Sequence, residues 1–349
     1  MLSVAVTKPG RIEIVDIPKP TPGPYDAIVR NQVAYICNAT DRKVVAAHFP
    51  GLGPETFPLL LGHESVGVVE SVGNRVRSYA PGDRVIGGLL LSPTDPAYTS
   101  GWGGNSEYVV ATDHDAMVKD GVADEAHGWK EVFQIMRKLP ADISLEAAAL
   151  LCTWREVYAG FSDFQLKPGN SILIFGAGPV GLSFCRFARL LGMGWIGCVD
   201  PIPFKRDKAK SMGADETFAP DSPELAGLTA KRGKPLDAVI DAVGSEKIIN
   251  AGLPLLRLAG SLCVYGVLGA DTLTLAKSTA PLNFNVLVHQ WPTRVAEAAA
   301  QEPLIEWIRA GKIAAKDFFS AEFPVRDAAK AMAATEQPTA IKTLLRFPS

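Results

Sequence analysis

Apolar residues in the first third of the chain occur in short runs separated by turn-forming residues. Up to about residue 110, runs rich in Val and Ile alternate with clusters of Pro, Gly and Asp, such as the stretch from Pro18 to Pro24. Many short apolar runs with frequent turn signals are typical of a β-barrel or a folded sheet. We therefore expect strands within residues 4–6, 12–17, 27–34, 60–69 and 84–88.

From Ser144 onward the pattern changes, because helical spacing begins there and short buried β runs then alternate with helical segments. This alternation predicts a doubly wound parallel sheet of the Rossmann type. Its expected strands are residues 171–175, 196–200, 237–241 and 261–265. A helix over residues 295–310 and a last strand–helix–strand stretch follow, with the three elements at 319–323, 327–334 and 341–347.

These patterns divide the chain into two expected domains and give an α/β fold class. Residues 1–150 together with 290–349 would form a β-rich domain, and residues 151–289 a dinucleotide-binding domain. The last stretch is assigned to the first domain because a Rossmann sheet is already complete before it.

Residues 120–138 have a pattern of their own. Four apolar residues fall at i, i+3, i+4 and i+7, which predicts one face of an amphipathic helix: Trp129, Val132, Phe133 and Met136. We favour a helix that packs on its own domain. A lid over an active-site cleft and a contact between subunits are the alternatives.

The most informative stretch is Ser171–Gly181, with the sequence SILIFGAGPVG. A buried strand runs directly into a G-x-G-x-x-G pattern, a helical segment follows, and Asp200 ends the next apolar run about 20 residues later. Gly176 allows a tight turn, Gly178 lets the backbone approach a pyrophosphate, and Gly181 lets the helix pack on the strand. The helix N-terminus then offers free N–H groups to the phosphates. A glycine-rich turn in some other α/β domain is the less favoured alternative.

Composition and charge exclude function classes without indicating one. The 349 residues are 47% hydrophobic and 21% charged, and the net charge of −2 gives no indication of binding to nucleic acid or to an anionic membrane. The N-terminus alternates like a strand and lacks the apolar core of a signal peptide, and no stretch approaches the ~20 apolar residues of a membrane span. Five scattered cysteines in such a chain predict reduced thiols and a cytoplasmic protein.

Three residues far apart in the sequence could together bind a metal ion: Cys37, His63 and Cys152. Two cysteines and a histidine are a suitable ligand set for catalytic zinc, which takes three protein ligands and keeps one position open. The thiolates balance the charge of Zn²⁺, and the metal can still stabilise an alkoxide as a Lewis acid. Taken singly, each residue has another explanation, since cysteines are often small buried hydrophobic residues.

Here the sequence resembles the zinc-dependent medium-chain alcohol and polyol dehydrogenases. Residues 62–76, GHESVGVVESVGNRV, fit the zinc signature of that family, and PGDRV, EYVV, GAGPVG and GAD follow in the family's order. The resemblance covers essentially the whole chain. It implies a GroES-like β fold for the first domain and a Rossmann domain between its two parts.

The resemblance also implies zinc held by Cys37, His63 and Cys152, with Glu64 as a fourth ligand or as a neighbour of the ligands. Alcohol dehydrogenases are themselves an example of catalytic zinc held by two cysteines and a histidine. Many relatives hold a second, structural zinc by four close cysteines, and residues 91–106 contain none. We expect one catalytic zinc and no structural zinc.

The sequence departs from the family where the substrate proton would leave. Two residues separate Cys37 from the Thr40-Asp41 pair, whereas most relatives have one. The resemblance implies that Thr40 passes the proton outward, and the insertion leaves Asn38, Lys43, His48 or a water molecule as alternatives. The expected catalytic residues are therefore Thr40, Glu64, Lys43 and His48.

The expected cofactor is NAD. A carboxylate at Asp200 would accept hydrogen bonds from the adenosine ribose and repel a 2′-phosphate, which favours NAD over NADP. Lys205 and Arg206 could contact the adenosine or the phosphate, or lie on a solvated helix face. The residues expected to bind the cofactor are Gly176, Gly178, Pro179, Val180, Gly181, Asp200, Lys205, Val243 and Val267.

The expected reaction is hydride transfer between NAD(H) and a secondary alcohol or ketone, in a homodimer or homotetramer. Polar groups near the site would suit a polyol, sugar or cyclitol. The pocket candidates are Phe49, Phe57, Trp102 and Trp154, with Arg42, Lys43 and Glu156 as polar partners. Two other classes stay open: a zinc-free quinone or enoyl reductase of the same fold, and a non-catalytic nucleotide-binding protein.

Overall fold

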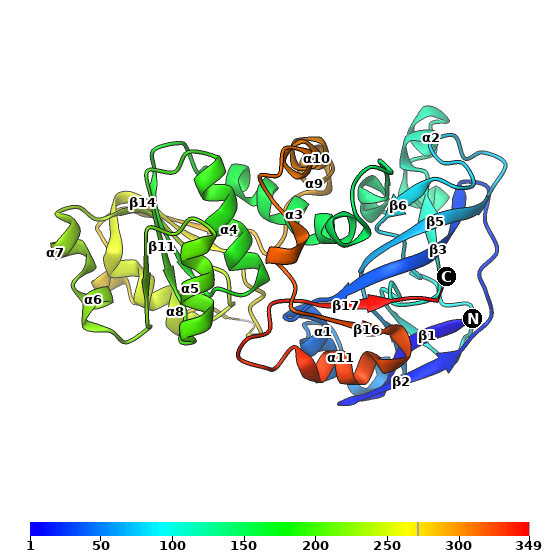
Figure 1. Cartoon of the computed structure of the whole chain (residues 1–349), viewed down its shortest axis with the longest axis horizontal. Coiled ribbons are helices and arrows are strands. Elements are labelled where there is room, and N and C mark those ends of the chain that lie inside the picture. Colours follow the sequence, from blue (N-terminus) through cyan, green and yellow to red (C-terminus); the bar gives the residue numbers. More distant parts are fainter. Residues whose placement is uncertain (271, 349) are drawn as a thin grey trace. The chain divides into compact units, whose positions relative to one another are not determined.

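Strands from both ends of the chain pair in a seven-stranded sheet, in which β17 lies beside β3 (Figure 1). The computed structural model describes residues 1–270 and 272–348. Within these residues the strand order is β16-β17-β3-β5-β6-β9, with β8 paired to β3. The strands are β3 (Asp26–Ile36), β5 (Glu64–Val72), β6 (Arg84–Ile86), β8 (Tyr108–Thr112), β9 (Arg137–Leu139), β16 (Ala321–Pro324) and β17 (Thr343–Arg346).

A four-stranded sheet packs against this one. Its order is β2-β1-β4-β7, and its strands are β1 (Leu2–Lys8), β2 (Arg11–Asp16), β4 (Leu59–Leu61) and β7 (Thr99–Gly101). One cluster of buried apolar side chains draws from both sheets, with Ala5 and Leu60 on one side and Val29 and Val69 on the other. The predicted β-rich domain therefore has a folded-sheet core.

The single strand predicted over residues 60–69 is two strands, because the chain turns at Gly62. This residue has φ +101, and a Cβ atom there would lie 2.1 Å from the Asn105 side chain. Only glycine fits such a position without strain. The break places His63 between the end of β4 and the start of β5.

The amphipathic helix predicted over residues 120–138 is wrong. The segment forms the short 3-10 turns η2 (Glu125–His127) and η3 (Glu131–Ile135), and Gly128 between them is left-handed with φ +75. Its apolar residues nevertheless lie in or against the apolar core of their own domain: Trp129, Val132, Phe133 and Met136. The segment therefore packs on its own domain, as expected from the sequence, although it does not form a helix.

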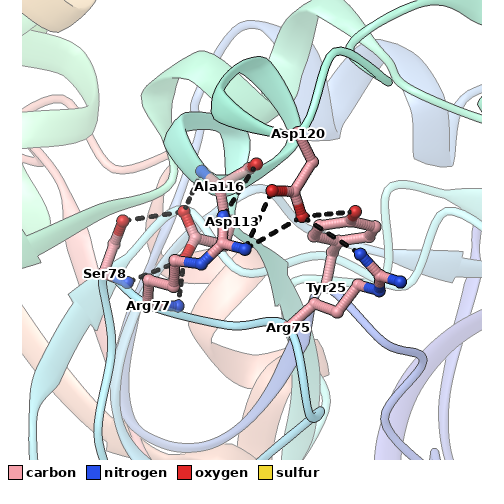
Figure 2. A network of polar contacts seen from close by, with 7 residues as sticks. All are labelled: Tyr25, Arg75, Arg77, Ser78, Asp113, Ala116 and Asp120. Carbon is pink, nitrogen blue, oxygen red and sulfur yellow. Dashed lines mark hydrogen bonds and ion pairs between the residues drawn. The ribbon is translucent and has the colours of Figure 1, made fainter.

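Two carboxylates hold α2 (His114–Lys119) against the loop after β5 (Figure 2). Asp113, at the N-terminus of α2, accepts hydrogen bonds from three backbone N–H groups, those of Arg77, Ser78 and Ala116. Burial alone would raise the pKa of Asp113, but these donors outweigh it and lower the pKa. Asp120 contacts three side chains, those of Tyr25, Arg75 and Arg77. This network is part of the scaffold and includes none of the candidate ligands.

Residues 153–293 form a second compact unit around six parallel strands in the order β12-β11-β10-β13-β14-β15. The strands are β10 (Ser171–Phe175), β11 (Trp195–Val199), β12 (Glu216–Phe218), β13 (Leu236–Asp241), β14 (Leu256–Val264) and β15 (Phe284–Val288). The helices between them are α4 (Pro179–Leu190), α5 (Pro203–Ser211), α6 (Pro223–Ala226), α7 (Leu228–Arg232) and α8 (Glu246–Gly252). The predicted parallel, doubly wound sheet is confirmed.

The first compact unit combines residues 1–152 with 294–349. The helix predicted over 295–310 is divided at Ala300 into α9 (Arg294–Ala299) and α10 (Gln301–Arg309). The last stretch then forms β16, α11 (Ala328–Ala334) and β17, as predicted. In the described part of the chain, no helix is long and apolar enough to cross a membrane.

Candidate functional site

Three strand ends of the seven-stranded sheet meet at one point. In the pairing of β17 with β3, Thr343 lies opposite Ile36, and in the pairing of β3 with β5, Tyr35 lies opposite Glu64. The end of β3 and the beginnings of β5 and β17 are therefore neighbours. Four polar residues stand at this point: Cys37, His63, Glu64 and Lys342.

Cys37, His63 and Glu64 form a group that could hold a metal ion. One ligand atom from each residue lies within 4.8 Å of the other two. Nε2 of His63 lies 3.9 Å from a carboxylate oxygen of Glu64, so this ring nitrogen is directed into the group. A thiol, an imidazole and a carboxylate are the donor types that zinc takes in proteins. The group fits zinc, and no other group of three or more such donors is found among residues 1–270 and 272–348.

Asp41 orients two of these residues from behind. Its side chain is fully buried, and one carboxylate oxygen accepts a hydrogen bond from the backbone N–H of Cys37 (2.9 Å). The other oxygen lies 3.3 Å from Nδ1 of His63. A carboxylate on the second nitrogen of a ligating histidine fixes the tautomer and the ring orientation. Asp41 is thus placed to orient the His63 ring so that Nε2 is free for a metal, although Nδ1 and the facing Asp41 oxygen, both buried, make no hydrogen bond among the described residues.

The electrostatics of His63 depend on the same carboxylate. Burial alone would lower the pKa of His63, but the negative charges of Asp41 and Cys37 outweigh it and raise the pKa. A bound zinc ion would act in the opposite direction, because ligation requires the neutral ring.

Lys342 forms a buried ion pair with Glu64. Its ammonium group donates a hydrogen bond to the Glu64 carboxylate, and the two side chains are only 2% and 4% exposed. Nζ also lies 5.5 Å from the centre of the Tyr35 ring, within range of a cation–π contact. Burial alone would lower the pKa of Lys342, but Glu64 and then Cys37 outweigh it and raise the pKa. The ammonium group therefore stays charged in the interior.

Cys152 lies near this group but is not part of it. It belongs to α3 (Leu145–Asp163), is 8% exposed, and contributes to raising the pKa of Lys342. Its thiol is therefore within electrostatic reach of the group of three. Its role as a zinc ligand stays a prediction.

The candidate relay residues lie at and after α1 (Thr40–Val45). Thr40 is the first residue of this helix and is half-buried, and within the described residues its hydroxyl has no hydrogen-bond partner. Lys43 is half-buried on the same helix, whereas His48 is exposed beyond its end. This placement favours Thr40 over His48 as a proton relay.

The inserted residue after Cys37 is accommodated by the neighbouring C-terminal segment. The side-chain amide of Asn38 donates to the backbone carbonyl of Ile341, at 2.7 Å. The backbone N–H of Asp41 still donates to the carbonyl of Cys37, at 3.1 Å. The insertion therefore does not separate Asp41 from the ligands.

Two of the expected pocket aromatics lie beside the candidate ligands. The Trp102 ring centre is 5.3 Å from that of His63 and 5.4 Å from that of Phe49. These rings give the metal group an apolar flank.

Two other pocket candidates differ in their exposure. Trp154 is fully buried, and the Arg42 side chain is 46% exposed and pairs with Glu336 at 3.1 Å. The guanidinium group of Arg42 therefore forms an ion pair at the surface.

In the second unit, the glycine pattern forms the turn between β10 and α4. Gly176 has φ +96, and a Cβ atom on Gly181 would lie 1.7 Å from the Gly176 carbonyl oxygen. The fold itself therefore requires these two glycines. Gly178 is different, since its φ is −73 and a Cβ atom there would meet no atom within 4 Å. This open space at the start of α4 fits a dinucleotide pyrophosphate.

Asp200 follows β11 and faces the glycine turn. One oxygen of its carboxylate accepts a hydrogen bond from the Ala177 N–H and the other from the Ile202 N–H, both at 2.8 Å. The guanidinium of Arg206 donates to the backbone carbonyls of Asp200 (2.7 Å) and Pro201 (2.9 Å). Asp200 is thus held beside the glycine turn, and Arg206 contacts the backbone at the same place.

The remaining cofactor candidates are placed around this turn. Pro179 is the first residue of α4 and Val180 the second, and both are half-buried, as is Lys205 on α5. Val243 is 47% exposed, and its side chain lies close to Gly176. The backbone of Val267 lies close to Gly244 in the neighbouring loop.

Comparison with known proteins places the chain in a family. Residues 23–121 match the alcohol dehydrogenase GroES-like domain, and residues 179–299 match the zinc-binding dehydrogenase domain. The NADP-dependent isopropanol dehydrogenase of Thermoanaerobacter brockii is 30% identical over 275 residues, which cover 77% of this chain and 76% of that protein. The chain belongs to the zinc-dependent medium-chain alcohol dehydrogenases. This dehydrogenase is also 28% identical to D-xylulose reductase A of Aspergillus niger over 355 residues, 96% of this chain and 93% of that protein.

Solved structures show the same fold for this dehydrogenase. Alcohol dehydrogenase TADH from Thermus sp. ATN1 has a TM-score of 0.80 at 24% identity and covers both chains fully. A 2R,3R-butanediol dehydrogenase from Bacillus subtilis has a TM-score of 0.79 at 19% identity and covers 100% of this chain and 99% of its own. The predicted fold, a GroES-like domain with a Rossmann domain, is confirmed. Family membership makes the chain an alcohol oxidoreductase and favours this function over the zinc-free and non-catalytic alternatives.

Proposed function

We propose that this dehydrogenase oxidises a secondary alcohol of the polyol, sugar or cyclitol type, or reduces the matching ketone, with one zinc ion and NAD. The observation that carries the proposal is the group of Cys37, His63 and Glu64 backed by Asp41. The relatives support the substrate class, since they include enzymes named for isopropanol, xylulose and butanediol.

Each residue of the group has a task in this proposal. Cys37, His63 and Cys152 would hold the zinc, and Asp41, whose carboxylate lies 3.3 Å from Nδ1 of His63, would keep the ring in its tautomer. Zinc would supply Lewis-acid stabilisation of negative charge on the substrate oxygen. The nicotinamide of the cofactor would carry the hydride. Thr40 receives the substrate proton and passes it outward.

A steady-state assay tests this function most simply. Secondary alcohols, polyols, sugars and cyclitols are supplied with NAD⁺, and the absorbance of NADH is followed with and without a zinc chelator. Turnover of at least one of them that disappears on chelation supports the proposal. Turnover that is unaffected by chelation contradicts it.

Cofactor choice is expected to favour NAD over NADP because Asp200 presents a carboxylate beside the glycine turn. Asp200→Ala is expected to weaken NAD binding about tenfold, which corresponds to the loss of ~1.4 kcal/mol of hydrogen bonding. The same substitution is expected to reduce the preference for NAD over NADP. The ratio of kcat/KM with the two cofactors measures this. A higher kcat/KM with NADP in the wild type would show that Lys205 or Arg206 dominates.

Thr40→Val is expected to keep zinc and NAD binding but to lower kcat for alcohol oxidation by roughly 10²–10⁴, because a methyl group cannot pass the proton on. The measurement is kcat against pH for Thr40→Val, with Lys43→Met and His48→Asn in parallel. If Thr40→Val keeps its kcat at neutral pH, the hydroxyl is only part of the turn after Cys37.

Assembly and location are also proposals. A homodimer or homotetramer is supported by exposed apolar residues on and near β15, the last strand of the parallel sheet: Leu258, Leu282, Val286, Val288 and Trp291. Sedimentation velocity would give the copy number. A cytoplasmic location is supported by the five scattered free cysteines.

A further inference from the structure

The ion pair of Lys342 and Glu64 is placed where it can control the metal group. Glu64 Oε1 lies 3.9 Å from Nε2 of His63, and the other oxygen of the same carboxylate, Oε2, accepts the hydrogen bond from Lys342. The carboxylate therefore has a metal ligand on one side and a buried cation on the other. A small movement of the carboxylate would decide whether it binds the metal or pairs with Lys342.

Charge balance shows why the cation matters. Two thiolates neutralise Zn²⁺, so a third anion, Glu64, would leave the group with an excess negative charge in the interior. A buried carboxylate without a cation is strongly disfavoured. Lys342 is the cation that the structure provides, since it is 2% exposed and bonded to Glu64. With Lys342 in place, the negative charge of Glu64 is balanced without a bond to the metal.

The fold fixes Lys342 at this position. It directly precedes β17, whose pairing with β3 sets Thr343 opposite Ile36. Its ammonium group lies over the ring of Tyr35, and its backbone carbonyl accepts from Ser320 at 2.9 Å. The C-terminal segment thus places the positive charge of Lys342 beside the metal group, whose residues come from the N-terminal strands.

We propose that Lys342 is a positioning residue that holds the Glu64 carboxylate off the zinc ion and so keeps one coordination position free for substrate. This proposal rests on the proposed function, in which Cys37, His63 and Cys152 bind zinc. Without the lysine, Glu64 turns to the metal, closes the free position and slows metal release.

The test replaces zinc by Co²⁺, whose visible absorption reports the number and type of ligands, and compares Lys342→Met with Lys342→Arg. Methionine keeps an apolar chain over Tyr35 but removes the charge, whereas arginine keeps the charge. In Lys342→Met we expect a changed Co²⁺ spectrum, roughly 10–100-fold slower release of metal to a chelator, and a lower kcat. In Lys342→Arg we expect the wild-type spectrum.

Two further variants separate positioning from a merely structural role. Glu64→Gln with Lys342 intact is expected to keep the wild-type Co²⁺ spectrum, because Glu64 is then not a ligand. In the double variant Glu64→Gln with Lys342→Met, the wild-type spectrum is expected to return, because a neutral amide has no charge to bring to the metal.

Two results would overturn the proposal: a wild-type spectrum and release rate in Lys342→Met, or an altered spectrum in Glu64→Gln. An altered spectrum in Glu64→Gln would overturn the proposal even if Lys342→Met fails to fold. Absence of metal binding by the wild-type protein would instead contradict the proposed function, so the two failures are distinguishable.

Discussion

His63→Ala is expected to lose the bound zinc and to lower kcat/KM for alcohol oxidation about a thousandfold or more. Lewis-acid stabilisation by a metal contributes several kcal/mol to the transition state, and each 1.36 kcal/mol is a factor of about ten in rate. His63 supplies one of the three donor atoms, from Cys37, His63 and Glu64, that lie within 4.8 Å of one another, and an Asp41 oxygen lies 3.3 Å from its Nδ1. The measurements are zinc content and steady-state rate, with circular dichroism to follow the fold.

His127→Ala is the matched control for this prediction. His127 is half-exposed, its ring pairs with Asp124, the residue that caps η2, and it belongs to no part of the candidate site. It is expected to keep both zinc and activity. Wild-type zinc content in His63→Ala would show that His63 is an ordinary polar residue and not a zinc ligand.

The second large effect is expected at the glycine turn, where two neighbouring glycines should respond in opposite ways. Gly181→Ala would place a Cβ atom 1.7 Å from the Gly176 carbonyl oxygen, a backbone atom that cannot move aside easily. Overpacking of this kind costs about 3 kcal/mol or more. We expect a fall of roughly 5–10 °C in Tm and loss of NAD binding together.

Gly178→Ala is the matched comparison. Its φ of −73 suits alanine, and no atom lies within 4 Å of the added methyl group. We expect an unchanged Tm without cofactor and a Kd for NAD raised about tenfold or more, because the methyl group takes space at the pyrophosphate. Equal loss of Tm in both variants, or unchanged NAD binding in Gly178→Ala, would contradict a dinucleotide site at this turn.

Much of the fold could be predicted because local patterns are strong there. The strand at 171–175, the turn at Gly176 and the later β-α-β stretch were visible in apolar runs and glycines. The helix over 120–138 was wrong because apolar spacing alone does not distinguish an α-helix from two 3-10 turns. Gly128, left-handed with φ +75, breaks the segment, and the apolar residues reach the same core without a helix.

The candidate site could be predicted only in part. Cys37 and His63 were identified by residue type and by family resemblance, and the structure places them together. Asp41 was visible in the sequence, but only the structure shows that it contacts both. Lys342 gave no signal, because it lies 278 positions from Glu64 and only the pairing of β17 with β3 brings them together. Long-range pairing of this kind leaves no local pattern.

Metal analysis of the freshly purified protein, paired with the alcohol assay, tests the central claim most directly. The account predicts one zinc per chain, and oxidation of a secondary alcohol with NAD⁺ that is lost on chelation and restored by added zinc. Two zinc ions per chain would contradict the expected absence of a structural site. A protein that binds no zinc, or that turns over equally well after chelation, would contradict the account itself.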